Sequence, residues 1–564
     1  MEQPPPRASN ARIVSVGVVL VIAWSLVGYR LTVVQGAHAE EFAARGLEQR
    51  LQSETLAADR GTIFDRDGRE LAVTVEGVTV YANPHEISDP ETVASLLAPL
   101  VGRNPTDLAQ ELATDAAFVY IARQLDPEDA EPIEDAGLAG IHFLSEPRRV
   151  YPTAALAAHV VGFVQDGDNT GLEGIELFYE SELAGTPGAL LVERDPEGRV
   201  IPQGAYRVEP AEQGSDLVLT IKSEIQYAAT NALAAAIERT SAAAGSIVVL
   251  DPETGEILAM VNLPTFNPND RTGATTDDLR NRAVTDVFEP GSTQKLVTIS
   301  GALESDIVAP TTSFDIPDRI EILDTVFKDV TVHPDQLTVT EIVAHSSNLG
   351  TILVGDILGT RPLYTYMYAF GQGRPSGIDF PGEAGGVLRP PEEWCLTTCL
   401  AGTSIGYHVS VTPLQMAMVY ATVANDGMWV QPHLVREIVD GSGGRSPAMP
   451  LARRVISSGT AAEMRIMLEA VVARGTGTAA VVSGYRIGGK TGTTNKYLTD
   501  LQAYSEEEVV ASFIGMAPID DPKVVVAVVL DSPQDDASGG KGAAPVFAEV
   551  MLAALHQVGV PPNG

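Results

Sequence analysis

Two neighbouring segments near the C-terminus constrain the fold more than any other feature of the sequence. Residues 509–517 and 523–531 are apolar at almost every position, and the turn-forming run Asp520-Asp521-Pro522 separates them. Strands that are apolar on both faces have to be buried on both, so helices must cover their sheet on either side. The sequence therefore predicts a hairpin inside a helix-covered sheet.

The remaining elements of this region complete a fold prediction. Residues 246–250 and 256–262 form a second predicted hairpin, and residues 270–470 between the two hairpins are mainly helical in pattern. A closing helix is predicted over residues 546–556. We expect an α+β domain over residues 213–560: an antiparallel sheet covered by helices, with a helical insertion.

The start of this domain is marked by a change in the sequence pattern near residues 209–215. A short strand is predicted at residues 217–220, followed by an Ala-rich helix that ends near Ala244. Ser223 and Gln226 have the spacing of a capping box at the start of that helix.

The N-terminus is predicted to be a membrane anchor. Seventeen uncharged residues, 13–29, lie between Arg12 and Arg30, and the span can extend to residue 34. We therefore expect a cytoplasmic tail over residues 1–12 and a transmembrane helix over residues 13–34.

Two features complicate this prediction. Ala37-His38-Ala39 resembles a signal-peptidase site, so cleavage is the alternative. The apolar run is long for a signal peptide and Arg30 interrupts the approach to the site, which favours an uncleaved anchor. Arginines occur on both sides of the span, so charge alone does not orient the protein.

Residues 35–212 are expected to form a separate elongated α+β pedestal. A polar, helical stalk is predicted over residues 36–60, and residues 60–72 predict two short strands around an Asp-Gly turn. Short helices and a strand at residues 118–122 follow. This half contains no catalytic constellation, so it is interpreted as a spacer or docking module.

Charge excludes one broad class of function. The 37 basic residues are outnumbered by 74 acidic ones, giving a net charge of −37. Nucleic-acid binding requires clustered cations, so no nucleic-acid partner is expected.

The two cysteines, Cys395 and Cys399, make a poor zinc site because no Cys/His cluster lies near them. They could pair as a disulfide if their segment is a loop, and two buried free thiols are equally plausible. No metal and no cofactor are predicted.

Ser292 and Lys295 form the first candidate catalytic pair. Pro290 and Gly291 break the preceding segment, and the apolar spacing that follows predicts a helix starting at or just before Ser292. A serine there lies at the positive end of the helix dipole, and a lysine three residues on shares its face. An unprotonated lysine can remove the proton from a serine nucleophile. The simpler interpretation is a capping serine followed by a solvated lysine.

Lysine scarcity favours the catalytic interpretation. The chain contains only seven lysines, and arginine supplies most of its positive charge. Arginine does not give up its proton, so a site that needs a neutral amine must use lysine.

Two further motifs follow in order. Ser346-Ser347-Asn348 supplies a hydroxyl and an amide two residues apart, and Lys490-Thr491-Gly492-Thr493 is predicted to lie on a strand. Each is weak alone. All three in this order match the Ser-x-x-Lys, Ser-x-Asn and Lys-Thr-Gly set of penicillin-recognising serine enzymes.

Two other serines carry misleading motifs. Ser538 begins a second Ser-x-x-Lys run, but its glycines predict a mobile loop without a fixed face. Ser404 lies in a Gly-x-Ser-x-Gly run, but no strand is predicted before it, so it does not fit a nucleophile elbow.

The sequence resembles the class B penicillin-binding proteins, monofunctional peptidoglycan transpeptidases, and among them the septal, cell-division type. The likeness covers nearly all of residues 13–560. Departures are few, notably His408 and the cysteine pair. The segments that carry it are residues 60–72, 149–152, 171–174, 289–292, 410–415, 475–480 and 489–493.

The resemblance implies a mechanism on a stem peptide that ends in D-Ala-D-Ala. Ser292 would form an acyl-enzyme, Lys295 would take the serine proton, and Ser346 would relay a proton to the leaving D-alanine. Asn348 would orient Lys295. The terminal carboxylate would be held by Lys490, Thr491 and Thr493, and Gly492 would also belong to the substrate-binding strand. The oxyanion hole would be formed by the backbone N–H groups of Ser292 and Thr493.

The resemblance also implies partners and a location. β-Lactams mimic D-Ala-D-Ala and would acylate Ser292. A polytopic lipid II glycan polymerase and other division proteins are the expected partners, and the protein is expected to be single-pass in the plasma membrane with its catalytic domain outside the cytoplasm. Alternatives are a β-lactamase or D,D-carboxypeptidase of the same fold, or a non-catalytic β-lactam sensor or division scaffold.

Overall fold

The structure is a computed structural model that describes residues 10–193, 201, 206–323, 325–498 and 502–562. Residues 1–9 of the expected cytoplasmic tail lie outside the described residues. The chain divides into two compact units, which are described separately below. The first consists of Met1–Ala58 and Thr186–Glu212, and the second of Asp59–Gly185 and Gln213–Gly564.

The first unit begins with one long apolar helix. Helix α1 (Asn10–Thr32) continues into a π-helical turn, η1 (Val33–Ala37). The 27 residues of Asn10–Gly36 are long and apolar enough to cross a membrane, since 27 helical residues span about 40 Å. The structure confirms the predicted apolar N-terminal helix.

A second helix and a small sheet complete this unit. Helix α2 (Ala39–Arg50) leads into strand β1 (Leu51–Leu56), which pairs antiparallel with β8 (Gly188–Glu193); β8 pairs in turn with β9 (Tyr206–Glu209). The prediction of a helical stalk was therefore wrong for residues 51–56. Their pairing with a strand more than a hundred residues away overrides local helical preference.

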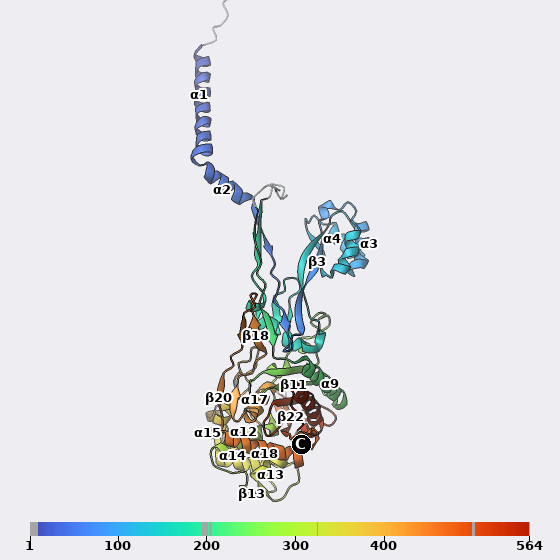
Figure 1. Cartoon of the computed structure of the whole chain (residues 1–564), viewed down its shortest axis with the longest axis vertical. Coiled ribbons are helices and arrows are strands. Elements are labelled where there is room, and N and C mark those ends of the chain that lie inside the picture. The colour runs from blue at the N-terminus through green and yellow to red at the C-terminus, as the bar shows by residue number, and fades with distance from the viewer. Residues whose placement is uncertain (1–9, 194–200, 202–205, 324, 499–501, 563–564) are drawn as a thin grey trace, which may run out of the picture. The chain divides into compact units, whose positions relative to one another are not determined.

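The N-terminal part of the second unit is built on a long twisted sheet. The predicted strands around the Asp-Gly turn are β2 (Ile63–Phe64) and β3 (Glu70–Ala82), and β3 also pairs with β4 (Val119–Leu125) and β5 (Ile141–Val150). Figure 1 shows helices α3 and α4 beside β3. The helices of this lobe, which bury an apolar cluster against the sheet, are α3 (Pro90–Val101), α4 (Pro105–Leu112) and α5 (Pro127–Asp135).

A buried ion-pair network joins two of the sequence motifs in this part of the chain, residues 60–72 and 149–152, to Glu176, which follows the third motif. Glu176 is fully buried and accepts hydrogen bonds from Arg60 Nε at 2.6 Å and Arg149 Nε at 2.7 Å. The hydroxyl of Tyr151 lies 3.4 Å from the same carboxylate and accepts from the backbone N–H of Val164. Segments that are far apart in the sequence therefore share one charged centre, where each charge needs its partners.

The short elements around this network continue the chain. They are η3 (Ala154–Ala157), α6 (Ala158–Val161), β6 (Phe163–Val164), β7 (Gly171–Glu173), α7 (Gly174–Phe178) and α8 (Glu180–Leu183). Strand β10 (Asp216–Leu219) then pairs in parallel with β2 and antiparallel with β18 (Val435–Val439), so the first sheet extends into the C-terminal part of the unit.

The second sheet of this unit has five antiparallel strands in the order β12-β11-β23-β22-β21. Its two predicted hairpins are β11 (Ala244–Leu250) with β12 (Ile257–Leu263), and β22 (Ala503–Ala517) with β23 (Val524–Asp531). The edge strand β21 (Gly488–Leu498) carries the Lys-Thr-Gly motif, as predicted.

Helices cover both faces of this sheet, which confirms the expectation from its apolar strands. Alternate residues of β23 belong to different clusters: Val526 and Val528 pack with α9 (Ser223–Thr240) and α19 (Ala544–Gln557), whereas Val525 and Ala527 pack with α17 (Pro413–Ala424). Burying both faces in this way supplies a large hydrophobic stabilisation.

The helical insertion lies between the two hairpins. Its helices are α10 (Thr276–Leu279), α11 (Arg282–Thr285), η4 (Gly291–Gln294), α12 (Lys295–Glu304), α13 (Val339–His345), α14 (Asn348–Leu358), α15 (Thr360–Ala369), α16 (Cys399–Ser404), α17 and α18 (Ser458–Arg474). Its short strands are β13 (Ser313–Asp315) with β16 (Gln336–Thr338), β14 (Ile320–Ile322) with β15 (Thr325–Phe327), and β17 (Met428–Val430) with β20 (Ala452–Arg454), while β19 (Arg445–Pro447) pairs with β18.

The predicted capping box at Ser223 and Gln226 is wrong. Helix α9 begins at Ser223 itself, and Ser223 Oγ donates to the carboxylate of Asp65. The Gln226 amide instead pairs with the backbone of Met260 on β12, donating to its carbonyl and accepting from its N–H at 2.9 Å each. Both side chains have tertiary partners that the local spacing could not reveal.

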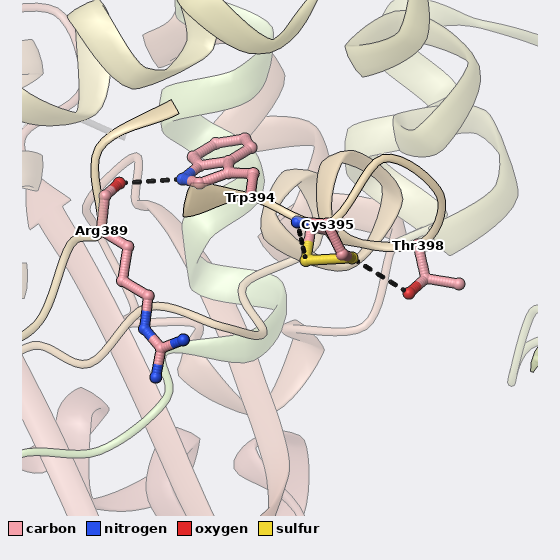
Figure 2. The surroundings of a disulfide bond; sticks show 5 residues. Arg389, Trp394, Cys395 and Thr398 are labelled. Atoms are coloured by element: carbon pink, nitrogen blue, oxygen red, sulfur yellow. Dashed lines mark hydrogen bonds between the residues drawn. A yellow bond between two sulfur atoms is a disulfide. The ribbon is translucent and has the colours of Figure 1, made fainter. Parts of the chain in front are cut away.

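The two cysteines form a disulfide, which settles the question that the sequence left open. Cys395 lies in an irregular segment and Cys399 is the first residue of α16. Figure 2 shows the bond beside Trp394, whose Nε1 donates to Arg389 O at 2.8 Å. Because Cys395 precedes the helix, the pair avoids the geometry that a regular helix would impose.

Candidate active site

The turn that carries Ser292 lies against strand β21. Segment η4 begins at Gly291 and runs directly into α12, so the helix starts just before the serine, as predicted. Gly291 has φ +52°, and a Cβ there would lie 2.1 Å from Thr494 Oγ1 on β21. Only glycine allows this close approach of the serine turn to the strand.

Ser346 contacts Ser292. It ends α13 in the left-handed conformation with φ +59°, which is uncommon for a residue other than glycine and is often found at functional sites. Its Oγ donates to Ser292 Oγ at 3.1 Å. Within the described residues, the Ser292 hydroxyl makes no other hydrogen bond.

Lys295 is almost completely buried, with 1% of its surface exposed. Its Nζ donates to Asn348 Oδ1 at 2.7 Å and to Ser346 O at 2.6 Å, and lies 3.3 Å from Ser346 Oγ. Burial lowers the pKa of Lys295 to about 7, against the opposing charge of Asp329. A substantial fraction of the amine is therefore neutral near neutral pH.

Lys490 approaches the same serine from β21. Its Nζ donates to Ser346 Oγ at 2.8 Å and it is also 1% exposed. Burial, and then the charge of Lys295, hold the pKa of Lys490 well below its usual value. Two lysines thus converge on one hydroxyl in a site that disfavours two positive charges, so their protonation is coupled.

The residues after Lys490 have tertiary partners of their own. Thr491 Oγ1 lies 2.9 Å from Thr476 Oγ1, and Thr493 Oγ1 accepts from Gly539 N at 3.0 Å. A Cβ at Gly492 would lie 2.3 Å from Ser512 Oγ and 3.0 Å from the side chain of Thr293. Gly492 therefore lets the strand pack against the serine turn.

Asp329 is a site residue that sequence reasoning missed. Its carboxylate accepts from Ser347 Oγ at 2.7 Å, from the backbone N–H of Asn348, and from Leu349 N at 3.1 Å. It thereby holds the Ser-x-Asn turn at the start of α14, where the helix dipole favours a negative charge. No local motif marks it, because it lies 18 positions before Ser347, on the other side of helix α13 in the sequence.

The two misleading serines lie in different settings. Ser404 is fully buried in α16 and its Oγ donates to Leu400 O, so it does not lie at a strand-to-helix elbow. The expected loop after Ser538 is instead the π-helical segment η7 (Gly539–Ala543). A Cβ at Gly539 would lie 2.4 Å from Gly492 O, so this glycine allows close packing against β21 rather than forming an open loop.

Two domain families match the sequence. The Penicillin binding protein transpeptidase domain matches residues 245–552, and the Penicillin-binding Protein dimerisation domain matches residues 55–219.

Full-length relatives support the same conclusion. The sequence is 34% identical over 569 residues to the probable peptidoglycan D,D-transpeptidase PenA of Neisseria meningitidis, covering 99% of this chain and 94% of the relative. It is 32% identical to the peptidoglycan D,D-transpeptidase FtsI of Escherichia coli, covering 97% and 92%. Penicillin binding protein 3 of Mycobacterium tuberculosis, solved in complex with aztreonam, is similar in structure with a TM-score of 0.72, 30% identity, and coverage of 91% and 98%.

Proposed function

The chain belongs to the class B penicillin-binding proteins, and from this we propose that Ser292 is the nucleophile of its D,D-transpeptidase reaction. The enzyme is a serine D-Ala-D-Ala transpeptidase of peptidoglycan synthesis. The observation that carries the proposal is the convergence of Lys295 and Lys490 on Ser346, which in turn bonds Ser292.

In the proposed acylation step, Ser292 Oγ attacks the carbonyl of the penultimate D-alanine. Its proton leaves toward the buried lysines, with Lys295 as the base. The 3.1 Å contact with Ser346 favours a route through that hydroxyl, although catalytic hydrogen bonds often tighten only when substrate binds. The same Ser346 hydroxyl then delivers a proton to the amine of the departing D-alanine. Asn348 keeps Lys295 in position through its 2.7 Å contact.

The substrate carboxylate is proposed to bind beside Lys490. A carboxylate there would favour the charged form of Lys490, which burial alone disfavours. Thr491, Gly492 and Thr493 would line the same strand edge, and the backbone N–H groups of Ser292 and Thr493 would stabilise the oxyanion, a contribution of about 3 kcal/mol per donor. An amine of a neighbouring stem peptide then releases the acyl group and forms the cross-link.

Mass spectrometry after penicillin treatment of the full chain tests the nucleophile. The adduct is expected on the peptide that contains Ser292, and an adduct on Ser404 or Ser538 would refute the proposal. Nitrocefin turnover separates the alternatives: a β-lactamase clears it rapidly, a transpeptidase remains acylated, and a scaffold does not become labelled.

We also propose a septal role, with a polytopic lipid II glycan polymerase and other division proteins as partners. The proposal rests on the family resemblance together with the apolar helix Asn10–Gly36, which would anchor the protein with its catalytic part outside the cytoplasm. In this arrangement residues 35–212 form the pedestal and residues 213–560 the transpeptidase domain. A mature N-terminus at Glu40 would refute the anchor, and co-purification with an elongation polymerase would refute the septal role.

A further inference from the structure

A pocket of about 390 Å³ lies behind the catalytic segment, at the end of helix α15. Its walls are partly apolar and partly cationic. The lining includes Phe370, Trp429 and Leu451, together with two arginines, Arg374 and Arg453. None of these residues belongs to the proposed catalytic set, so the pocket needs an explanation of its own.

The two arginines have no carboxylate partner within the described part of the chain. This is unusual here, because acidic residues outnumber basic ones by 74 to 37 and most other arginines of this unit form ion pairs. Their guanidinium groups instead lie over aromatic rings, Arg374 at 4.3 Å from the centre of Tyr368 and Arg453 at 4.4 Å from Trp429. The pocket therefore has unneutralised positive charge on its wall.

Arg453 has unused hydrogen-bonding capacity. Its Nη1 donates to Ala369 O at the end of α15, but its Nη2 is buried without a hydrogen-bond partner. Burial, and then the charge of Arg374, lower the pKa of Arg453 to about 10. Leaving a buried cationic donor unpaired is costly, and a bound anion would remove that cost.

The backbone keeps space in front of these donors. Gly371 has φ +101°, and a Cβ there would lie 3.4 Å from Trp429 Nε1 and 3.9 Å from Arg453 Nη2. The indole Nε1 makes no hydrogen bond within the described residues, so it is a third donor at the same place. A side chain at position 371 would partly fill the space between them.

A purely structural role explains only part of this arrangement. An arginine that caps a helix C-terminus and stacks on an indole is common, and this accounts for Arg453 Nη1 and Trp429. It does not account for a second arginine, without a carboxylate partner in the described residues, whose charge acts on the first, since two like charges in a partly buried site repel.

We propose that this pocket is a binding site for an oxyanion, a carboxylate or a phosphate group, held between Arg374 and Arg453. Guanidinium groups bind both kinds of group through paired hydrogen bonds. The apolar wall formed by Phe370 and Leu451 can in addition contact an organic body that carries the anionic group.

The pocket is connected to the catalytic turn by a buried pair of amides. Gln372, which follows Gly371, donates to Gln294 Oε1 at 2.6 Å and accepts from Gln294 Nε2 at 3.1 Å. Gln294 lies between Ser292 and Lys295, and both glutamines are fully buried. An anion that fixes the Phe370–Arg374 segment would therefore act on the turn that positions the nucleophile.

Calorimetric titration of the full chain in detergent micelles tests the site. Inorganic pyrophosphate and citrate serve as separate probes, so that phosphate and carboxylate ligands are distinguished. We expect one binding event for at least one probe. The affinity should fall about tenfold or more in Arg374→Gln and in Arg453→Gln, because each variant loses one charge-assisted contact. Arg454→Gln is the matched control, because the neighbouring Arg454 donates to Asp426 O and Ile456 O instead.

Arg374→Gln keeps the test valid if the loss of Arg453 disturbs folding, because Arg374 makes no side-chain hydrogen bond within the described residues. Absence of binding by both probes, or equal binding by the parent and Arg374→Gln, would overturn the site. The connection to catalysis is tested separately: the rate constant for acylation by a fluorescent penicillin should change at least about twofold with saturating probe, in the parent but not in Arg374→Gln. An unchanged rate in the parent would overturn that connection.

Discussion

Ser346 Oγ donates a hydrogen bond to Ser292 Oγ across 3.1 Å, although 54 positions separate the two serines in the sequence. The same Ser346 oxygen lies 2.8 Å from Lys490 Nζ and 3.3 Å from Lys295 Nζ. The Ser346 hydroxyl can therefore relay a proton between Ser292 and either lysine.

Replacing Ser346 by alanine tests that position directly. Ser346→Ala should lower the second-order rate constant for β-lactam acylation by about 10²-fold or more, the usual size of a general acid–base contribution. Labelling by a fluorescent penicillin measures it, with Ser538→Ala as a control that should acylate like the parent. A Ser346→Ala protein that acylates at the parental rate would remove this hydroxyl from the mechanism.

Arginine substitutions separate the two lysines. Arginine keeps the positive charge but cannot act as a base, so Lys295→Arg should lose acylation by about 10²-fold or more. Lys490→Arg should retain part of the rate and mainly weaken capture of the carboxylate. The measurement is the acylation rate constant of each variant; a fast Lys295→Arg enzyme and an inactive Lys490→Arg enzyme would reverse the assigned roles.

The pH dependence of acylation should report the pKa of Lys295. Because this pKa is about 7, the rate should fall as pH drops below about 7 and the amine becomes protonated. The Asp329 charge raises that pKa, and Lys490 on strand β21 is the cation that lies close to Lys295 of helix α12. Asp329→Asn should therefore lower this pKa and move the acid limb of the pH–rate profile for acylation to lower pH.

The matched control for this prediction is Asp335→Asn, which removes the same charge from an exposed position nearby. Acylation rates measured from pH 5 to 9, a range that brackets the pKa of about 7, give the acid limb of the pH–rate profile in each variant. A limb that stays in place in Asp329→Asn, or moves to higher pH, contradicts the assignment of Lys295 as the titrating base.

The buried network around Glu176 should be critical for stability. Glu176→Gln leaves Arg60 and Arg149 without their shared carboxylate, and removing one partner of a buried ion pair costs about 3–5 kcal/mol. Glu180→Gln is the control, since Glu180 pairs with Arg60 at 2.7 Å and accepts from Gly171 N at 2.9 Å, but is 33% exposed. Denaturant unfolding should show a much larger loss for Glu176→Gln, and equal losses would argue against the network.

The Cys395–Cys399 disulfide closes a short loop and should stabilise the protein modestly. Chain-entropy arguments give about 2 kcal/mol for a loop of this length, so Cys395→Ser/Cys399→Ser should lower the free energy of unfolding by about that amount. Thiol titration provides the second measurement. Unfolded parental protein without reductant should show no free thiol, and two titratable thiols would refute the bond.

Several features of this protein could be predicted from local sequence. The strands at residues 509–517 and 523–531 are apolar at almost every position, and a strand that is apolar on both faces has to be buried on both. The helix start before Ser292 follows from Pro290, Gly291 and the apolar spacing after them, because turn and helix preferences act over a few residues. The order of the three motifs then indicated the family.

Other predictions failed because distant segments supplied stronger partners than near ones. Residues 51–56 form a strand because β8 pairs with them along their whole length. Gln226 bonds to Met260 instead of capping its own helix. Gly539, the first glycine after Ser538, packs against Gly492 where a mobile loop was expected.

The chemistry of the site depends on the tertiary structure. Ser346 reaches Ser292, and Asp329 holds the Ser-x-Asn turn, only because separate segments of the helical insertion pack against one another. The lowered pKa values of Lys295 and Lys490 arise from burial and from the proximity of two like charges. Removal of water and the distances between charges are properties of the packed chain, so residue identity and spacing alone could not supply them.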